Sequence, residues 1–153
     1  MSVKTAQGGY AFAGGQDTVD FCLPLVQTTL VLTNALQADG FINADASYQW
    51  KVDLRPFRQV KLTGYIKTVS ASANTPRLQL RYNAATSTTP ANFSQLGVSS
   101  VEISMFTGTV FADSGWIDLK EAARIDNCFL GLMNIGGDGA ADPAVNNVYA
   151  YFK

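Results

Sequence analysis

The carboxylates are the first residues whose chemistry has to be weighed, because the sequence contains no histidine. Imidazole is the commonest general base, the commonest zinc ligand and the central member of the Ser-His-Asp and Cys-His arrangements, so its absence argues against most classes of hydrolase. A glycosidase needs two carboxylates that face each other across a cleft. Glu102 and Glu121 are the only glutamates, and Glu102 alternates with apolar neighbours, which predicts that it faces solvent. We therefore expect no enzymatic activity and no catalytic residue.

Two segments carry oxygen ligands of the kind that calcium prefers. Asp138 and Asp142 lie in "GGDGAADP", and Asp39, Asn43 and Asp45 lie in "ADGFINADA". Neither segment has the D-x-[DN]-x-[DN]-G spacing with a distant glutamate that marks a calcium loop. Glycines that permit positive φ, followed by a proline, describe a surface loop between two strands equally well. We expect no metal site and no cofactor, with Asp138 and Asp142 as candidates for a loop contact or a cation.

Aromatic side chains offer a second kind of chemistry, because an exposed ring can stack on a sugar or pack against another protein. In the final "NVYAYFK", Tyr149 and Tyr151 alternate with apolar residues that include Phe152. This pattern predicts a ridge of two tyrosines on the outer face of the last strand. The ridge could bind a glycan or pack against another subunit, and the low charge of the chain favours the subunit. Trp50 shares the apolar face of its own strand, so we expect it to pack into the core.

The composition indicates one domain without a strongly charged surface. The chain has 153 residues, 15% of them charged, and a formal net charge of −1, so we expect no nucleic-acid partner and no anionic membrane held by bulk charge. No stretch approaches the roughly 20 apolar residues of a membrane helix, and the first residues lack the apolar core of a signal peptide. We expect a soluble chain made in a cytoplasm, with Cys22 and Cys128 as buried free thiols.

A period of two dominates the chain after its first residues and predicts half-buried strands. The alternating segments are "WKVDLR", "VKLTGYIK", "RLQLRY", "SVEISMF" and "NVYAYFK". Two others, "TTLVLT" and "CFLGLMNI", are apolar on both faces, which predicts central strands. Turn-rich pieces separate the strands, so we expect an antiparallel sandwich or barrel. The one helical candidate is "DLKEAARI", residues 118–125, with about two turns.

A short run recurs in the two halves of the chain. One residue separates Trp50 from the run "VDLRPFRQV", and Trp116 stands directly before the run "IDLKEAARI". A jelly roll contains paired Greek keys, in which similar corners can recur, although chance similarity over so few positions is the alternative. Under the first interpretation, Asp53 and Asp118 are corner residues that accept backbone N–H bonds rather than catalysts.

Residues 1–18 form a segment of different composition from the rest. Four glycines surround an isolated Tyr10 and Phe12, and such a segment cannot form a core of its own. We expect an extended N-terminal arm, followed by a single β-sandwich domain over residues 19–153. The arm is either a loose terminus or a segment whose aromatic residues dock onto a neighbouring subunit.

Three segments together resemble the jelly-roll structural proteins of tailed bacteriophages, a group that includes capsid decoration (cement) proteins and small modules of tail fibres and baseplates. These segments are "GGYAFAGGQDT", "WKVDLRPFRQVKLTGYI" and the closing "CFLGLMNIGGDGAADPAVNNVYAYFK". The resemblance implies an antiparallel jelly-roll-like β-sandwich with an N-terminal arm and no catalytic residue. It also implies a homotrimer on the capsid surface of a virion, whose arm, residues 2–17 with Tyr10, Phe12 and Asp17, clamps a neighbour.

The partner that this resemblance implies is the major capsid protein or another virion protein, bound through many weak contacts repeated on a symmetric shell. A carbohydrate- or receptor-binding module of a phage tail fibre or baseplate is the alternative, because the same fold can display a ridge of aromatic residues to a glycan. An ordered arm and a stable trimer favour the decoration protein, and quenching of tryptophan fluorescence by a sugar favours the module.

Overall fold

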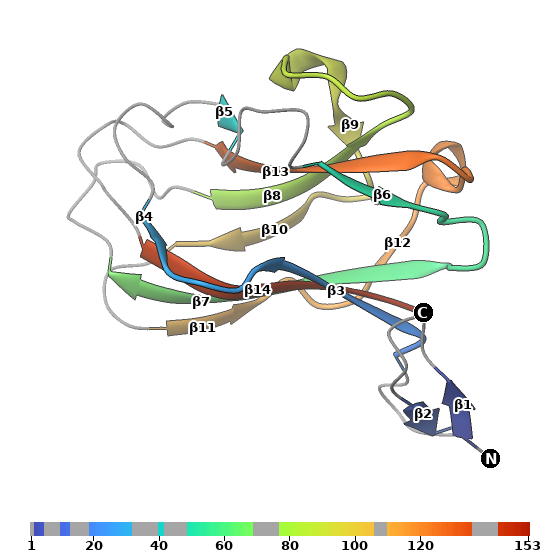
Figure 1. The fold of residues 1–153 in the computed structure, drawn as a ribbon, viewed down its shortest axis with the longest axis horizontal. Coiled ribbons are helices and arrows are strands. Elements are labelled where there is room, and N and C mark those ends of the chain that lie inside the picture. The colour runs from blue at the N-terminus through green and yellow to red at the C-terminus, as the bar shows by residue number, and fades with distance from the viewer. Residues whose placement is uncertain are drawn as a thin grey trace.

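The computed structural model describes residues 2–4, 10–12, 19–31, 40–41, 49–68, 77–105, 110–135 and 144–153. These residues form two antiparallel sheets packed face to face as a β-sandwich (Figure 1). The predicted all-β fold is therefore confirmed. The described residues include no α-helix, and their only helical elements are two short 3-10 turns, η3 (Pro90–Asn92) and η4 (Glu121–Ala123). No helix in this part of the chain is long and apolar enough to cross a membrane.

Within the described residues each sheet contains six strands. Sheet I has the strand order β11-β7-β14-β3. Two short strands extend it, β12 pairing with β7 and β4 pairing with β14. The bounds are β11 (Val110–Asp113), β7 (Gln59–Thr68), β14 (Ala144–Phe152), β3 (Phe21–Val26), β12 (Ile117–Asp118) and β4 (Leu30–Val31).

Sheet II has the strand order β10-β8-β13-β5. Strand β6 also pairs with β13, and β9 pairs with β8. The bounds are β10 (Val101–Ser104), β8 (Arg77–Asn83), β13 (Cys128–Ile135), β5 (Gly40–Phe41), β6 (Trp50–Val52) and β9 (Ser94–Gln95).

The chain passes repeatedly between the two sheets. Strands β3, β7, β11 and β14 belong to sheet I, and the strands between them, β6, β8 with β10, and β13, belong to sheet II. Two interleaved Greek keys of this kind make a jelly roll, as predicted. The arrangement places the first and last strands of the sandwich, β3 and β14, side by side in sheet I.

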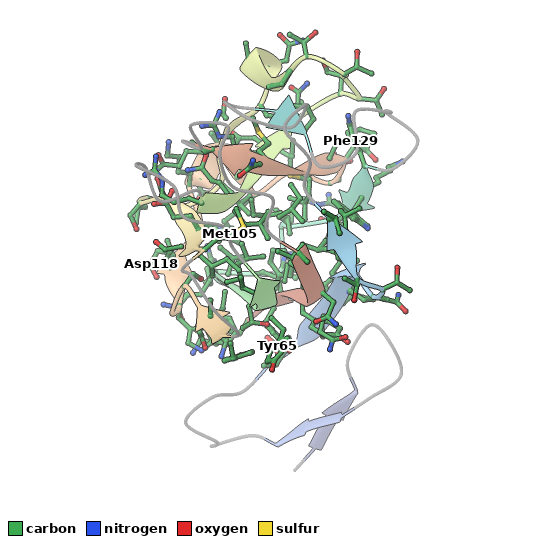
Figure 2. All side chains as sticks on the ribbon, turned by 90° about the vertical axis from the view of Figure 1, so that its left-hand side faces the viewer. Tyr65, Met105, Asp118 and Phe129 are labelled. Carbon is green, nitrogen blue, oxygen red and sulfur yellow. The ribbon has the colours of Figure 1, made fainter. Side chains whose placement is uncertain are left out.

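The core lies between the sheets and is built from the alternation that the sequence displays. On β7, Val60, Leu62 and Ile66 are fully buried. On β10 and just after it, Val101, Ile103 and Met105 are buried too, and Figure 2 shows Met105 between the two layers. Because successive side chains of a strand point to opposite faces, each such run buries one face and leaves the other for solvent or for a partner.

Two sequence predictions about single elements are wrong. Residues 32 and 33 of "TTLVLT" lie outside the described residues, and the described part contributes the two-residue β4, which pairs with β14. Val31 is 51% exposed, so this described part is not a central strand. "DLKEAARI" contains the end of β12 and the single turn η4 rather than an α-helix. The backbone N–H of Leu119 donates to Arg58 O at 2.8 Å and that of Lys120 to Leu96 O at 3.0 Å. These bonds to other segments hold the first residues of the run in place of a helical ladder.

The other segment that is apolar on both faces does form a central strand. β13 pairs with β8 on one side and with β5 and β6 on the other. Its outer face is covered as well, since Phe93 from the turn after η3 packs with Met133 and Ile135 in a small second cluster. A strand with apolar neighbours on both faces needs no alternation, which accounts for its continuous apolar sequence.

The two similar runs lie against each other as a pair of corners. Leu54 N donates to Ile125 O at 3.0 Å, and Leu119 N donates to Arg58 O at 2.8 Å, so the leucine of each run bonds to the other run. Both leucines are buried, and the aspartates beside them, Asp53 and Asp118, are exposed.

The aspartates of these corners behave differently. Asp53 Oδ1 accepts the backbone N–H of Arg55 at 3.1 Å, as predicted. The prediction is wrong for Asp118, whose Oδ1 accepts a bond from the side-chain Nε2 of Gln59 at 2.8 Å. The difference follows from the fold, because β12 pairs with β7 and brings the amide of Gln59 opposite Asp118.

The remaining predictions concern the cysteines and the N-terminus. Cys22 is half-buried and Cys128 buried, and both are free thiols. Within residues 1–18, β1 (Ser2–Lys4) and β2 (Tyr10–Phe12) pair as an antiparallel two-stranded sheet outside the sandwich (Figure 1). Tyr10 and Phe12, which we expected in an extended arm, thus lie in a short strand, and Asp17 lies outside the described residues.

Candidate functional site

The outer face of sheet I carries most of the aromatic side chains that do not belong to the core. On β7 and β14, the residues that alternate with buried ones point outward, and Figure 2 shows Tyr65 on the side of this sheet that faces away from sheet II. We call this surface the aromatic face and define it by five residues, Tyr65, Phe111, Trp116, Tyr149 and Tyr151. Phe111 is 61% exposed, which makes it one of the most exposed large apolar side chains among the described residues.

Strand register sets the neighbours on this face. Phe111 lies opposite Tyr65 across the β11–β7 ladder. Tyr151 lies opposite Lys61 across the β14–β7 ladder. The rings of Tyr149 and Tyr151 are 6.2 Å apart between centroids and tilted by 39°. The rings on this face therefore lie in two neighbouring pairs, Phe111 with Tyr65 and Tyr149 with Tyr151.

Two lysines share the ring of Trp116 at one end of the face. The Nζ of Lys61 lies 4.9 Å from the centroid of Trp116 and 5.5 Å from that of Tyr151. The Nζ of Lys153 lies 4.2 Å from the Trp116 centroid. These distances are those of cation–π contacts, which are strongest for tryptophan. We call Lys61, Trp116, Tyr151 and Lys153 the lysine–aromatic cluster.

A tight turn after β11 puts Trp116 into this cluster. The N–H of Gly115 donates to Asp113 Oδ1 at 2.7 Å, and Gly115 has φ of 71°, a conformation that glycine adopts at little cost. Ser114 fixes the turn to β7, because its N–H donates to Leu62 O and its Oγ accepts the N–H of Leu62, both at 2.9 Å. The turn therefore presents the next side chain, Trp116, to the neighbouring Lys61.

Main-chain bonds hold Lys153 in place. Its N–H donates to Gln59 O at 3.1 Å, and its carbonyl oxygen accepts the N–H of Arg58 at 2.7 Å and that of Gln59 at 2.9 Å. The backbone that carries the second ammonium is thus anchored to the start of β7.

The Tyr151 phenol and the neighbouring Cys22 thiol stay neutral near pH 7. Burial raises the pKa of the Tyr151 phenol, and a side-chain hydrogen bond with Thr63 opposes that rise. Burial also raises the pKa of the neighbouring Cys22 thiol, against a hydrogen bond with Tyr151. Neither group supplies a negative charge to the face or an activated nucleophile.

Charge is scarce on the face and unevenly placed. Asp113 is the acid beside the cluster, and its carboxylate lies 3.9 Å from the Nζ of Lys61, at the limit of an ion pair. The side chain of Lys61 is 13% exposed, so this ammonium is largely withdrawn from water.

The outer face of sheet II has a different character. Arg77 Nη1 donates to Glu102 Oε1 at 3.2 Å and Gln79 Nε2 donates to Glu102 Oε2 at 2.9 Å, while Arg81 Nε donates to Gln79 Oε1. Glu102 lies on the outward face of β10, as predicted, and its side chain is 22% exposed. The register limits this exposure, because it places Glu102 opposite Gln79 and beside an arginine.

The other sequence candidates fall in different places. Tyr149 and Tyr151 lie together on the outer face of β14, while Trp50 packs against the core. Asp138 and Asp142 lie outside the described residues, as do Asp39, Asn43 and Asp45. Across the part of the chain that the structure describes, no group of three or more Cys, Asp and Glu residues is placed to hold a metal ion.

Sequence reasoning counted Trp116 among the aromatic residues available for stacking, but it missed the two lysines beside that ring. Lys61 has the signal of an outward residue, because it alternates with Val60 and Leu62, but nothing local reveals the ring beside it. Trp116 follows a glycine that ends a turn, and Lys153 follows the last strand. Only the pairing of β14 with β7 and the return of the chain after β11 bring the three together.

Comparison of the chain with protein-family models, curated proteins and solved structures finds no match in any of the three.

Proposed function

We propose that this chain is a non-enzymatic structural protein that assembles into a trimer by burying its aromatic face, and that the trimer decorates a larger protein shell. The single observation that carries the first part is the exposed aromatic face on sheet I, with Phe111 61% exposed. Contiguous exposed apolar surface on a small domain marks an interaction site, and tyrosine, tryptophan and phenylalanine are enriched in protein interfaces.

The uncharged rings of the face support packing against another copy of the chain. Tyr149 lies opposite Thr63, which is buried, on one side and opposite Pro24 of β3 on the other. Asp113, two residues after Phe111, lies opposite Thr63 and adds a carboxylate to this part of the face. Aromatic rings supply contact area at a low cost in side-chain entropy. The lysine–aromatic cluster lies at the end of the face, where a rim is expected to be polar.

The shell that we propose is the capsid of a tailed bacteriophage, with the major capsid protein as the partner. Support comes from the resemblance in the three segments described above and from the jelly-roll topology. A decoration protein needs no catalytic group, since repeated weak contacts on a symmetric surface supply its affinity. The N-terminal hairpin, β1 with β2, is placed outside the sandwich, where it could reach a neighbouring subunit (Figure 1).

The native mass in solution tests this proposal. Light scattering behind a sizing column is measured for the full chain and for a version that lacks residues 2–17. We expect three times the 16.4 kDa chain mass from both, because the sandwich and not the arm makes the trimer. A monomer from both would refute the trimer.

A glycan-binding module is the second candidate, favoured by the adjacent rings of Tyr149 and Tyr151 on one strand. Sugars stack on open ring faces, so binding at this ridge would perturb the chain's tyrosine and tryptophan fluorescence. A saturable change with neutral oligosaccharides, together with a monomeric mass, would favour this module over the decoration protein.

A further inference from the structure

Strand β11 forms one edge of sheet I, and among the described residues its only strand partner is β7. The N–H of Ser114, the residue after β11, donates to Leu62 O at 2.9 Å. Hydrogen-bonded and non-hydrogen-bonded pairs alternate along an antiparallel ladder, so Ala112, two residues earlier, also bonds to β7. The N–H and C=O groups of Phe111 and Asp113 therefore point away from β7, toward the open edge.

The edge strands of the sandwich are protected to different degrees. An unpaired edge can pair with another chain, and a proline or a charge on the strand opposes such pairing. At the opposite edge of sheet I, β3 contains Pro24, which has no N–H to donate. In sheet II, the edge strand β10 carries Glu102. Strand β11 has no proline, and Asp113, at its end, accepts the N–H of Gly115. Of these three edges, that of β11 is the least protected.

Strands β1 and β2 have too few partners of their own. They lie outside the sandwich and, within the described residues, pair only with each other (Figure 1). Each has three residues, and a two-stranded sheet of this size is marginally stable at best in water unless a further strand or layer is added. The chain therefore contains a pair of strands that needs a neighbour and a sheet edge that lacks one.

The fold keeps these two parts of one chain apart. The N-terminal strands lead into β3, and the order β11-β7-β14-β3 places β3 at the far edge of sheet I. Three spacings of about 4.8 Å separate β3 from β11, a distance of about 14 Å. In Figure 1, β1 and β2 lie beyond the start of β3 and away from β11. A second copy can present its N-terminal strands to β11 without crossing the aromatic face.

We propose that β2 of one copy adds as a further strand to the β11 edge of a neighbouring copy, so that sheet I continues from chain to chain. This inference rests on the proposed function, since the trimer supplies the neighbour, and it identifies the site on which the N-terminal strands dock. Main-chain hydrogen bonds give strand addition its affinity. Strand β1 carries Lys4, whereas β2 is uncharged, which favours β2 as the added strand. Tyr10 and Phe12 alternate in β2, so a suitable register sets an aromatic residue opposite Phe111.

Hydrogen exchange resolved to single residues tests this inference. The amides of Phe111 and Ala112 are followed in the full chain, in a version that lacks residues 2–17 and in the Ala11→Pro variant, which removes the N–H from the middle of β2. The Ala112 amide, which bonds to β7 within its own chain, is the internal control. We expect the Phe111 amide to exchange about tenfold or more slowly in the full chain than in the other two, and Ala112 to exchange equally in all three.

Co-expression of the full chain with the truncated chain shows which copy supplies the strand. In mixed trimers the truncated chain keeps β11 but has no β2, so we expect a full-length neighbour to restore the protection of its Phe111 amide. The two chains differ in mass and can be followed separately. A truncated chain that stays unprotected in mixed trimers would show that the strand pairs within one chain and would overturn the inference.

The native mass of the same samples separates this inference from the proposed function. A trimer whose Phe111 amide exchanges equally with and without residues 2–17 overturns strand addition alone. An assembly of another size, in which protection of Phe111 requires residues 2–17 of a second copy, supports strand addition and refutes the trimer. A full chain that is a monomer overturns both.

Discussion

The ammonium group of Lys153 lies 4.2 Å from the centroid of the Trp116 ring, although Lys153 follows the last strand and Trp116 follows the turn after β11. The contact exists because β14 pairs with β7 and because the turn around Gly115 returns the chain to that strand. It joins three separate segments at one end of the aromatic face. Its energy can be measured independently of any partner.

A double-mutant cycle between Lys153→Met and Trp116→Leu should show this contact. We expect a coupling of about 0.5–1 kcal/mol in the free energy of unfolding, the usual size of a cation–π pair near a surface. Methionine keeps an unbranched side chain that is one heavy atom shorter and removes the ammonium group. Urea unfolding of the four proteins gives the value, and Lys51→Met with Trp116→Leu is the matched cycle, for which coupling should vanish. Equal coupling in both cycles would show that the Lys153 contact has no specific energy.

Three glycines should differ sharply in their tolerance of alanine. A Cβ at Gly97 would lie 2.5 Å from Ile117 Cγ2 and 2.8 Å from the backbone oxygen of Ser99, so we expect a loss of about 3 kcal/mol or more. At Gly64 the closest atom, at 2.8 Å, is the terminal Cδ1 of Ile103, which can move, and the expected cost is about 1–2 kcal/mol.

At Gly115 a Cβ would meet nothing within 4 Å, and only the positive φ of 71° opposes the substitution. The expected cost is about 1 kcal/mol. Thermal or urea unfolding of the three variants gives the order, and Gly115→Ala as the most damaging of them would contradict the described turn.

Arg124 should be the residue whose side chain stabilises the paired corners. Its Nε donates to Phe57 O at 2.8 Å and its Nη2 to Arg55 O at 2.7 Å, and its side chain is 12% exposed. Lysine cannot reproduce this planar set of donors, so Arg124→Lys should cost about 1–3 kcal/mol in the free energy of unfolding.

Arg58 provides the matched control for that substitution. Its side chain is exposed, and Arg58→Lys should change stability by less than about 0.5 kcal/mol. Equal effects of the two lysine substitutions in urea unfolding would show that the carbonyl contacts of Arg124 contribute little.

Stability should fall at alkaline pH, partly because of Cys128. Burial raises the pKa of the Cys128 thiol from 9.0 to about 12. In this range the unfolded chain has released the proton while the folded chain retains it, so unfolding becomes easier as pH rises. Below pH 9 the contribution is fully present, and it is lost progressively up to about pH 12.

Urea unfolding of the parent and of Cys128→Ala, at pH values from about 8 to about 11, checks this expectation. Near pH 8 the variant should be less stable because it leaves a cavity, but its stability should fall less steeply across the range. Parallel curves for the two proteins would rule out a raised thiol pKa at this position.

The sandwich could be predicted from sequence because the signal for each strand is local. In "WKVDLR" the buried Val52 and Leu54 alternate with exposed Lys51 and Asp53, and the same rule identified the core face of β7, β10 and β14. It failed where hydrogen-bond partners come from elsewhere in the chain. The N–H groups of Leu119 and Lys120 donate to other segments, and no pattern within "DLKEAARI" reveals those acceptors.

The candidate site could likewise be predicted from the sequence only in part. The outward positions of Tyr149 and Tyr151 follow from alternation with buried residues on one strand. The cluster around Trp116 does not follow from any local pattern, because it depends on the register between β14 and β7 and on the turn at Gly115. The sequence shows the glycine but not the direction in which the turn sends the chain. The position of Phe111 opposite Tyr65 likewise requires the β11–β7 pairing.

Native mass with a disrupted face tests the central claim most directly. Light scattering behind a sizing column is measured for the parent, for the Phe111→Thr/Tyr149→Thr double variant and for Val98→Thr, which removes an apolar side chain that is 64% exposed outside the aromatic face. We expect the parent and Val98→Thr to be trimers and the double variant to fall towards the 16.4 kDa of one chain while remaining folded. A double variant that keeps the mass of the parent, or a parent that is itself a monomer, would contradict assembly through this face.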